Sequence, residues 1–476
     1  MQGLLVLVAL GVCFGFHGPK MALRARPTQR TMQMRSYGPS SGYIAQKNGG
    51  SKSTSNAMTV NLTKNMVGAG VFSLSAKVAQ ISASTSIMGP VSALVLALAS
   101  WATYNFYTLS EVCRITNAST YPEAWGRTIS QKTKFLVSIV IVLAPVIACL
   151  SNTIVLTDVF GTLLKKAGAP IAISGNRNVV IALLSSLVFY PLCVKKDLGT
   201  LKSASAFGLL GHLSALGVML KRAFDGSYAV GGQYYAGSAM EAAAKAAAKS
   251  KAAAATTVFP LSSFFVVASM VSYCIVSHYN TAKYYNELEK KKDLPTVAAR
   301  AHLATATIYL GSMFAGLKLF GKSSKSFALG SLAAADPLSL VANVAFGCSV
   351  LASQPLIFLV MRNHFVDTLP KVLPFLKKQF TTEKVTVGLL AMIGYMCSKV
   401  QDVATVGTVA GSLLGSAMMF VFPPLLYIKA LQKEARNEGK RAPGLKIAFN
   451  SLLLIAGTAF WGTMSNNAIR NFVAAM

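Results

Sequence analysis

The chain has 476 residues, of which 53% are hydrophobic and only 13% are charged. Because a soluble domain carries roughly a quarter charged residues, this composition excludes an ordinary water-soluble protein. The formal net charge is +30, but Lys and Arg fall between apolar runs rather than in one patch, which argues against nucleic acid as a partner. Apolar runs of about twenty residues recur, each long enough to cross a hydrocarbon core of ~30 Å. Such runs must close their backbone hydrogen bonds internally, so the sequence predicts an all-α integral membrane protein.

Residues 1–57 differ in composition from the rest of the chain. The apolar run from Leu4 to Phe16 is too short to span a bilayer, and the Arg-rich stretch behind it has no Asp or Glu before Glu111. This layout is typical of a signal sequence joined to a transit peptide, which predicts a targeting leader and a plastid membrane. The alternative is a disordered basic N-terminus on a protein of the plasma or vacuolar membrane.

About eleven transmembrane helices are expected in residues 58–464, followed by a C-terminal tail at 465–476. An insert at 224–257, between the fifth and sixth spans, is rich in Ala and Lys and predicts a solvated helix. The expected spans are 58–80, 89–112, 135–164, 179–194, 201–220, 259–282, 296–319, 337–361, 385–398, 403–428 and 445–464.

The first span carries the most informative motif, Gly68-Ala69-Gly70. Glycines in mid-membrane let the backbone leave helical geometry. A broken helix presents N–H groups and carbonyls that bind a carboxylate and an ammonium group, and an amino acid has both. The alternative is close helix packing through small residues.

Lys64 precedes this motif by about one helical turn. A buried ammonium group is costly in the bilayer, so it must find a partner, lose its proton or extend to the interface. The functional interpretation is a fixed or titrating cation near the site, and the alternative is a lysine that snorkels from the helix end.

The sixth span contains a polar cluster that includes Ser272, Ser277, His278 and Tyr279. Polar residues within an apolar span usually face a cavity or the bundle interior, although a satisfied polar patch near the helix end is an alternative for His278. Two interrupted helices separated by four other spans are what an inverted five-plus-five repeat predicts.

No pattern in the sequence indicates catalysis. The histidines lack metal-binding spacing, and the chain has no phosphate loop or nucleophile elbow. We therefore predict no catalytic residues, no metal and no cofactor.

Several segments in chain order resemble the amino acid/auxin permease family, closest to its branch of sodium-coupled neutral amino acid transporters. The resemblance implies a leucine-transporter-like fold with an inverted five-plus-five repeat and one additional C-terminal helix. The segments that carry it are 61–75 (NLTKNMVGAGVFSLS), 190–203, 276–288, 336–362 and 403–427.

The resemblance also implies a binding site at the breaks in the first and sixth helices. The paired glycines would bind the substrate carboxylate, the sixth helix would receive the amino group, and the third helix would line the site. The substrate-binding residues implied in this way are Gly68, Ala69, Gly70, Asn152, Ser272, Ser277 and His278.

Two positions depart from the family pattern. Lys64, with Asn65 beside it, stands where related transporters have an Asn that helps hold sodium, and Ser353 is the partner hydroxyl in the eighth helix. An ammonium group at Lys64 would take the place of the sodium ion, so Lys64, Asn65 and Ser353 form the expected coupling-ion site. Tyr279 stands where the family often has proline, which removes the usual cause of the sixth-helix break.

These observations predict secondary active transport of amino acids by alternating access, proton-coupled or uncoupled rather than sodium-driven. The expected partners are an amino acid, the lipid bilayer and protons. The alternative is a non-transporting structural subunit that retains a transporter fold, because fold does not dictate function.

Overall fold

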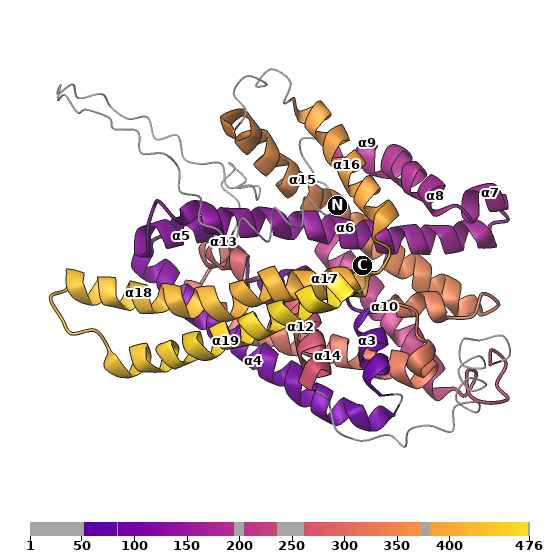
Figure 1. Ribbon diagram of the computed structural model, residues 1–476, viewed down its shortest axis with the longest axis horizontal. Coiled ribbons are helices and arrows are strands. Elements are labelled where there is room, and N and C mark those ends of the chain that lie inside the picture. Colours follow the sequence, from indigo (N-terminus) through magenta and orange to yellow (C-terminus); the bar gives the residue numbers. More distant parts are fainter. Residues whose placement is uncertain (1–51, 83, 195–203, 236–260, 373–380, 475–476) are drawn as a thin grey trace. The chain divides into compact units, whose positions relative to one another are not determined.

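The computed structural model describes residues 52–82, 84–194, 204–235, 261–372 and 381–474, and within them the fold is built from helices (Figure 1). The described residues also contain an isolated parallel β-bridge between Ser53 and Leu288. The expected leader and the Ala- and Lys-rich part of the expected insert lie outside the described residues.

Long, uninterrupted helices form most of the bundle. They are α4 (Met88–Thr116), α6 (Lys134–Lys166), α10 (Ala204–Phe224), α14 (Leu294–Phe320), α15 (Pro337–Val372), α16 (Thr382–Lys399) and α19 (Gly444–Ala474). The last of these continues through residues 465–474, the stretch expected to be a tail.

Other spans consist of successive shorter segments. These are α2 (Ser55–Met66) with α3 (Leu74–Ile81); α8 (Arg177–Leu183), η2 (Leu184–Phe189) and α9 (Tyr190–Cys193); α12 (Leu261–Ile275), η4 (His278–Asn280) and α13 (Thr281–Glu287); and α17 (Val403–Ala410), η9 (Gly411–Gly415), η10 (Ala417–Val421) and α18 (Phe422–Asn437). Short helices α5 (Tyr121–Thr128) and α7 (Ile171–Ser174) lie in the connections on either side of α6.

Local sequence sets the start of several helices. The Thr120 hydroxyl accepts a hydrogen bond from the Glu123 amide at the start of α5, with Pro122 in the first turn. The Asp402 carboxylate accepts from the Ala404 amide at 2.9 Å at the start of α17. These side chains satisfy amide groups that a helix N-terminus would otherwise leave unpaired.

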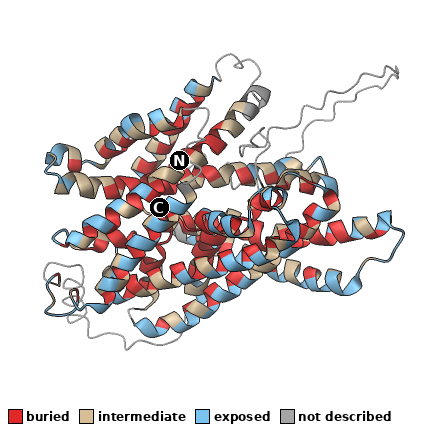
Figure 2. Ribbon diagram, turned by 180° about the vertical axis from the view of Figure 1, so that it is seen from behind, coloured by how far each residue is buried: buried red, intermediate tan, exposed pale blue. Residues whose placement is uncertain are grey.

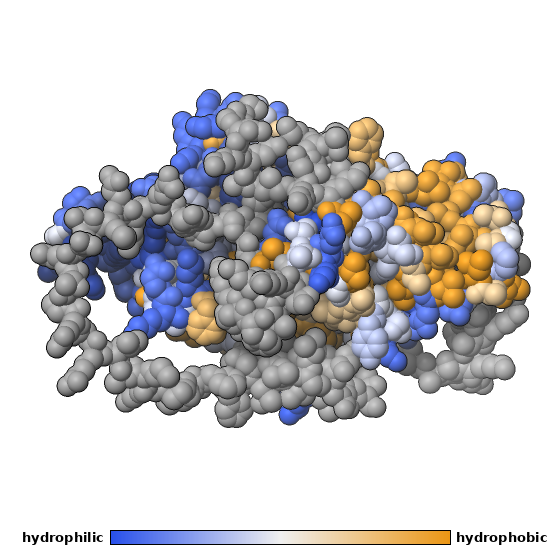
Figure 3. Space-filling view, turned by 90° about the horizontal axis from the view of Figure 1, so that it is seen from above, coloured by the Kyte–Doolittle hydropathy of each residue, from blue (hydrophilic) through white to orange (hydrophobic). Residues whose placement is uncertain are grey.

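Part of the outer surface of the bundle is apolar. In the described chain, seven helical segments are long and apolar enough to cross a membrane. In an apolar 18-residue stretch of Gly444–Arg470 only 17% is buried, whereas the corresponding share in Val403–Asn437 is 67%. Figure 2 shows the buried residues gathered where the helices face one another. Figure 3 shows a broad hydrophobic expanse on one face. Since water-exposed patches of this kind are unfavourable, this surface faces lipid, and the protein is a multi-pass membrane protein.

Candidate functional site

The first interrupted helix breaks at its paired glycines. Helix α2 ends at Met66, α3 begins at Leu74, and Val67 has extended geometry with φ −85° and ψ 92°. Gly68, Ala69 and Gly70 therefore lie in an unwound segment. The prediction that the first span is broken at this motif is confirmed.

Helix α14 supports the unwound segment through two hydroxyl groups. The Tyr309 hydroxyl donates to the Met66 carbonyl at 2.8 Å. The Ser312 hydroxyl is shared between the Val71 carbonyl at 2.9 Å and the Tyr309 carbonyl of its own helix at 2.8 Å. The Met66 and Val71 carbonyls would otherwise be unpaired in an environment without water. The sequence did not indicate Tyr309 or Ser312, because nothing in the spacing links positions more than two hundred residues apart.

The amide groups of Ala69 and Gly70 remain open. Within the described residues, no hydrogen-bond acceptor is recorded for either N–H, whereas the Val71 amide donates to the Gly68 carbonyl at 3.3 Å and the Ser73 amide to the Gly70 carbonyl at 3.1 Å. Two adjacent free N–H groups in an unwound membrane helix can bind an anion.

The second interruption lies between α12 and α13. Helix α12 ends at Ile275, and the chain continues through the single turn η4 before α13 begins at Thr281. The expected break in the sixth span is confirmed, and it forms with Tyr279 in place of a proline. At Gly70, an added Cβ would lie 2.7 Å from Cys274 Sγ, so the first break packs closely against the C-terminal end of α12.

A cavity of about 120 Å³ lies beside the two breaks. Its described lining contains Asn and Tyr side chains and a serine but no charged side chain, and most of the remainder is apolar. The lining residues are Asn65, Met66, Gly68, Ala69, Gly70, Val140, Ile141, Ala144, Ile147, Ala148, Ser151, Asn152, Tyr273, Cys274, Val276, Tyr279, Tyr309, Ile357, Ala410, Leu414, Gly415 and Met418.

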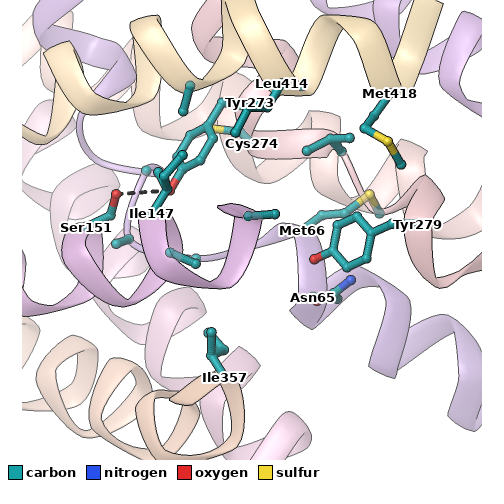
Figure 4. A pocket seen from close by; sticks show the side chains of 18 of the residues that line it. Asn65, Met66, Ile147, Ser151, Tyr273, Cys274, Tyr279, Ile357, Leu414 and Met418 are labelled. Carbon is teal, nitrogen blue, oxygen red and sulfur yellow. Dashed lines mark hydrogen bonds between the residues drawn. The ribbon is translucent and has the colours of Figure 1, made fainter. Parts of the chain in front are cut away.

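Polar side chains occupy both sides of this cavity (Figure 4). The Ser151 and Tyr273 hydroxyls form a 2.9 Å hydrogen bond on one side, and Asn65 lies beside Tyr279 on the other. Asn152 Nδ2 donates to Gln354 Oε1 at 3.0 Å. This bond links α6 to α15 and fixes the orientation of the Asn152 amide.

Some expected substrate-binding residues line the cavity and others do not. Gly68, Ala69, Gly70 and Asn152 line it, and so does Asn65 of the expected coupling-ion site. A substrate-binding role for all of them stays a prediction.

Ser272, Ser277 and His278 are buried outside the lining. Within the described residues, no hydrogen-bond partner is recorded for either serine hydroxyl. His278 Nε2 lies 3.3 Å from the Ala102 carbonyl, and its ring packs against Phe106. For these three side chains too, the role in substrate binding stays a prediction.

Lys64 and Ser353 have different surroundings. Lys64 is 9% exposed, its Nζ donates to the Val67 carbonyl at 3.3 Å, and its side chain passes Gly208 of α10. The Ser353 hydroxyl donates to the Ser349 carbonyl at 3.0 Å, within α15. No contact between Lys64 and Ser353 is recorded in the described chain, so their shared role as a coupling site stays a prediction.

Comparison with known proteins agrees with this geometry. A family model described as transmembrane amino acid transporter protein matches residues 51–465. No curated protein matches the chain. The solved structure of MhsT in complex with L-phenylalanine is similar with a TM-score of 0.54 and 12% sequence identity, over 88% of this chain and 100% of that one. At this identity the similarity shows the leucine-transporter-like fold alone.

Proposed function

Because the chain belongs to the transmembrane amino acid transporter family, we propose that it moves amino acids across a membrane by alternating access. The observation that carries the proposal is the pair of open N–H groups at Ala69 and Gly70 beside the cavity. A structural subunit would have no need for unpaired peptide groups around an internal cavity, since each one costs stability in a membrane.

The two breaks suit the two charged groups of an amino acid. The open amides of the unwound segment receive the carboxylate. The C-terminal end of α12 carries the partial negative charge of the helix dipole and carbonyl oxygens without helical partners, and it receives the ammonium group. Asn152, fixed by its bond to Gln354, borders the bound substrate.

The remaining lining sets the preference for the substrate side chain. Ile147, Ile357 and Leu414 contribute apolar groups, and the described lining holds no Asp, Glu, Lys or Arg. A charged substrate side chain would lose its hydration without gaining a partner. We therefore propose a neutral amino acid as the substrate.

Coupling is the second part of the proposal. Lys64 places an amine against the Val67 carbonyl next to the unwound segment. A tethered amine there supplies the positive charge that an inorganic cation would otherwise provide, so transport is proton-coupled or uncoupled rather than sodium-driven.

Uptake into proteoliposomes tests both parts. Purified protein is reconstituted, and uptake of labelled neutral, acidic and basic amino acids is measured with and without sodium and with an imposed pH gradient. We expect uptake of neutral amino acids that does not require sodium. The absence of uptake for every amino acid would overturn the transport proposal, whereas sodium-dependent uptake that is unchanged in Lys64→Ala would overturn only the proposal on coupling.

The membrane is a separate proposal that rests on the composition of residues 1–57. We propose a plastid membrane, because an apolar run followed by an acid-free, Arg-rich stretch is typical of a two-part leader. Fusion of residues 1–57 to a fluorescent protein in an alga with complex plastids tests it, and fluorescence at the plasma membrane or the vacuole would contradict it.

A further inference from the structure

Lys64 packs into a gap that α10 provides. An added Cβ at Gly208 would clash with Lys64 Cε and would lie 3.2 Å from its Nζ. Helix α10 in turn packs closely on α15, since an added Cβ at Gly211 would lie 2.9 Å from Ser349 Cβ. The amine of Lys64 is thus enclosed among α2, α10 and the unwound segment.

His212 lies one turn beyond Gly208 on α10 and is fully buried. Its Nε2 is 3.2 Å from the Gly68 carbonyl, and its Nδ1 is 2.9 Å from the Gly208 carbonyl. A carbonyl only accepts, and a neutral imidazole has one N–H, so a neutral ring donates to one of these oxygens at most. Only the doubly protonated ring has a proton for both sides.

Ser349 of α15 can form a hydrogen bond with His212 whether or not its Nδ1 carries a proton. Its hydroxyl is 2.6 Å from His212 Nδ1 and 2.5 Å from the Gly208 carbonyl. When Nδ1 carries a proton, the ring donates to the hydroxyl and the hydroxyl donates to the carbonyl. When Nδ1 is bare, the hydroxyl rotates and donates to Nδ1. Both protonation states of His212 therefore keep their hydrogen bonds.

Within the described parts of the chain, no ion pair with an acidic side chain is recorded for Lys64 or His212. Both bases contact Gly208 of α10, His212 through its Nδ1 and Lys64 through its side chain, so their charges lie near each other. The Tyr309 phenol on α14 donates to the Met66 carbonyl, and the Cys274 thiol on α12 lies against Gly70, so both titratable groups border the unwound segment that the two bases contact. Two full positive charges buried without a counter-charge would be strongly unfavourable.

We propose that Lys64 and His212 share a single proton and that this proton holds the unwound segment in the geometry that binds the substrate carboxylate. Whichever base is charged donates to a carbonyl of that segment, Lys64 to Val67 and His212 to Gly68. The Gly68 carbonyl belongs to the same peptide unit as the open Ala69 amide, and the Val67 carbonyl lies one peptide unit earlier. When the proton leaves for bulk water, the net charge of the pair falls from +1 to 0 and the positive charge that favours the carboxylate is lost.

The inference rests on the proposed function and makes a separate prediction about protonation. Substrate affinity is measured between pH 5 and 9 in detergent-solubilised protein, and protons taken up or released on binding are counted with a pH-sensitive dye. The variants are Lys64→Gln, His212→Gln and the double variant. Lys318→Gln, which changes an exposed lysine on α14, is the matched control.

With a shared proton, each single variant retains one basic group and still binds one proton per pair. The double variant loses the pH dependence and binds substrate about tenfold more weakly, as expected for one lost favourable charge. Complete loss of proton binding in one single variant, with no effect of the other, would overturn sharing. So would a double variant with the wild-type pH profile.

Ser349→Ala provides a test that leaves both bases in place. We expect it to keep one proton per pair but to move the midpoint of the pH profile, because the rotating hydroxyl is lost. An unchanged midpoint would contradict the role assigned to Ser349. If the wild-type protein binds no amino acid, the proposed function fails; if it binds and only the variants disagree, this inference alone fails.

Discussion

Gly208 illustrates how a single position can depend on a side chain from another helix. An added methyl group would overlap Lys64 Cε, and a well-packed interior accommodates such overlap at a cost of about 1–3 kcal/mol. We expect Gly208→Ala to lower the thermal unfolding midpoint and the affinity for substrate. Lys64→Ala in the same chain removes the overlapping atoms and should restore the unfolding midpoint.

Gly217 on the same helix is the control for this pair. An added Cβ there meets nothing within 4 Å, and alanine has a higher helix propensity than glycine. Gly217→Ala should therefore be neutral or stabilising in both backgrounds. If Gly208→Ala were equally destabilising with and without Lys64, the contact between them would not be the cause.

The paired glycines of the first break are expected to differ in their tolerance of a side chain. At Gly70 an added Cβ would lie 2.7 Å from Cys274 Sγ, whereas at Gly68 nothing lies within 4 Å. Gly70→Ala should push the two breaks apart and weaken substrate binding by about tenfold, the equivalent of about 1.4 kcal/mol. Gly68→Ala should leave the unfolding midpoint unchanged.

Isothermal titration calorimetry measures the effect of each variant on substrate affinity, and thermal unfolding measures its effect on stability. The double variant Gly70→Ala/Cys274→Ala should recover part of the lost affinity, because it removes the sulfur that the methyl group meets. If the double variant recovered neither affinity nor stability, the close contact between Gly70 and Cys274 would not be the reason that glycine is needed at this position.

At this scale the sequence indicated the backbone positions better than their partners. The motif Gly68-Ala69-Gly70 indicates a break, because glycine readily adopts backbone conformations outside the helix. His212 and Ser349 carried no such signal, since each looks like an ordinary polar residue in an apolar span. Their roles depend on contacts with distant parts of the chain, since His212 contacts the Gly68 carbonyl and Ser349 contacts His212, each more than a hundred residues away.

At the scale of elements, α14 holds the first break open. Tyr309 and Ser312 lie about one turn apart on this helix and bond to carbonyls on either side of the unwound segment. We expect Tyr309→Phe and Ser312→Ala each to cost about 1 kcal/mol, the usual net contribution of one buried hydrogen bond. Thermal unfolding measures this cost, and substrate titration shows whether the unwound segment loses its shape.

Thr307→Ala is the matched control on α14. Its hydroxyl is exposed, and its one recorded hydrogen bond within the described residues is to the Leu303 carbonyl of the same helix. This change should alter neither stability nor affinity by more than about 0.5 kcal/mol, as is usual for a surface substitution. If all three variants lost the same stability and affinity, α14 would be sensitive to substitution in general, and the bonds to the unwound segment would not be the cause.

The positions of the helices were largely predictable from the sequence. Each interruption depends on a different kind of residue and was not equally predictable. The first break follows from glycine, whereas the second was indicated only by polar residues such as Ser272 and Ser277. In the tenth span, no residue pattern indicated the π-helical segments η9 and η10. There Gly415 lies close to the Ser272 carbonyl, a contact that depends on tertiary packing.

At the scale of the whole bundle, composition alone predicted an all-helical membrane protein, because the bilayer leaves apolar segments few alternatives. The count of eleven spans and the inverted repeat stay predictions. Hydropathy cannot fix them where a span is short or carries charges, as α16 does with Glu383 and Lys384 in its first turn.

The two interrupted helices are also joined at one end of the bundle. Ser53, just before α2, exchanges hydrogen bonds with the backbone on either side of Leu288, just after α13, at 2.9 and 3.1 Å. The Ser55 hydroxyl donates to the Asp293 carboxylate at 2.9 Å. If transport proceeds by alternating access, opening the cavity toward this end requires these contacts to break, so weakening them should favour the state open on this side.

Asp293→Ala tests this idea, because it removes the acceptor of the Ser55 hydroxyl. One such bond contributes about 1 kcal/mol, so we expect hydrogen exchange in residues 52–58 and 287–293 to become about fivefold faster. Asp293→Asn keeps an oxygen acceptor and should stay near the wild-type rate. A saturating amino acid that seats between the two breaks should slow exchange in all three proteins, since it joins α2 to α12. Unchanged exchange in Asp293→Ala would mean that the backbone bridge at Ser53 holds this end closed without the side-chain contact.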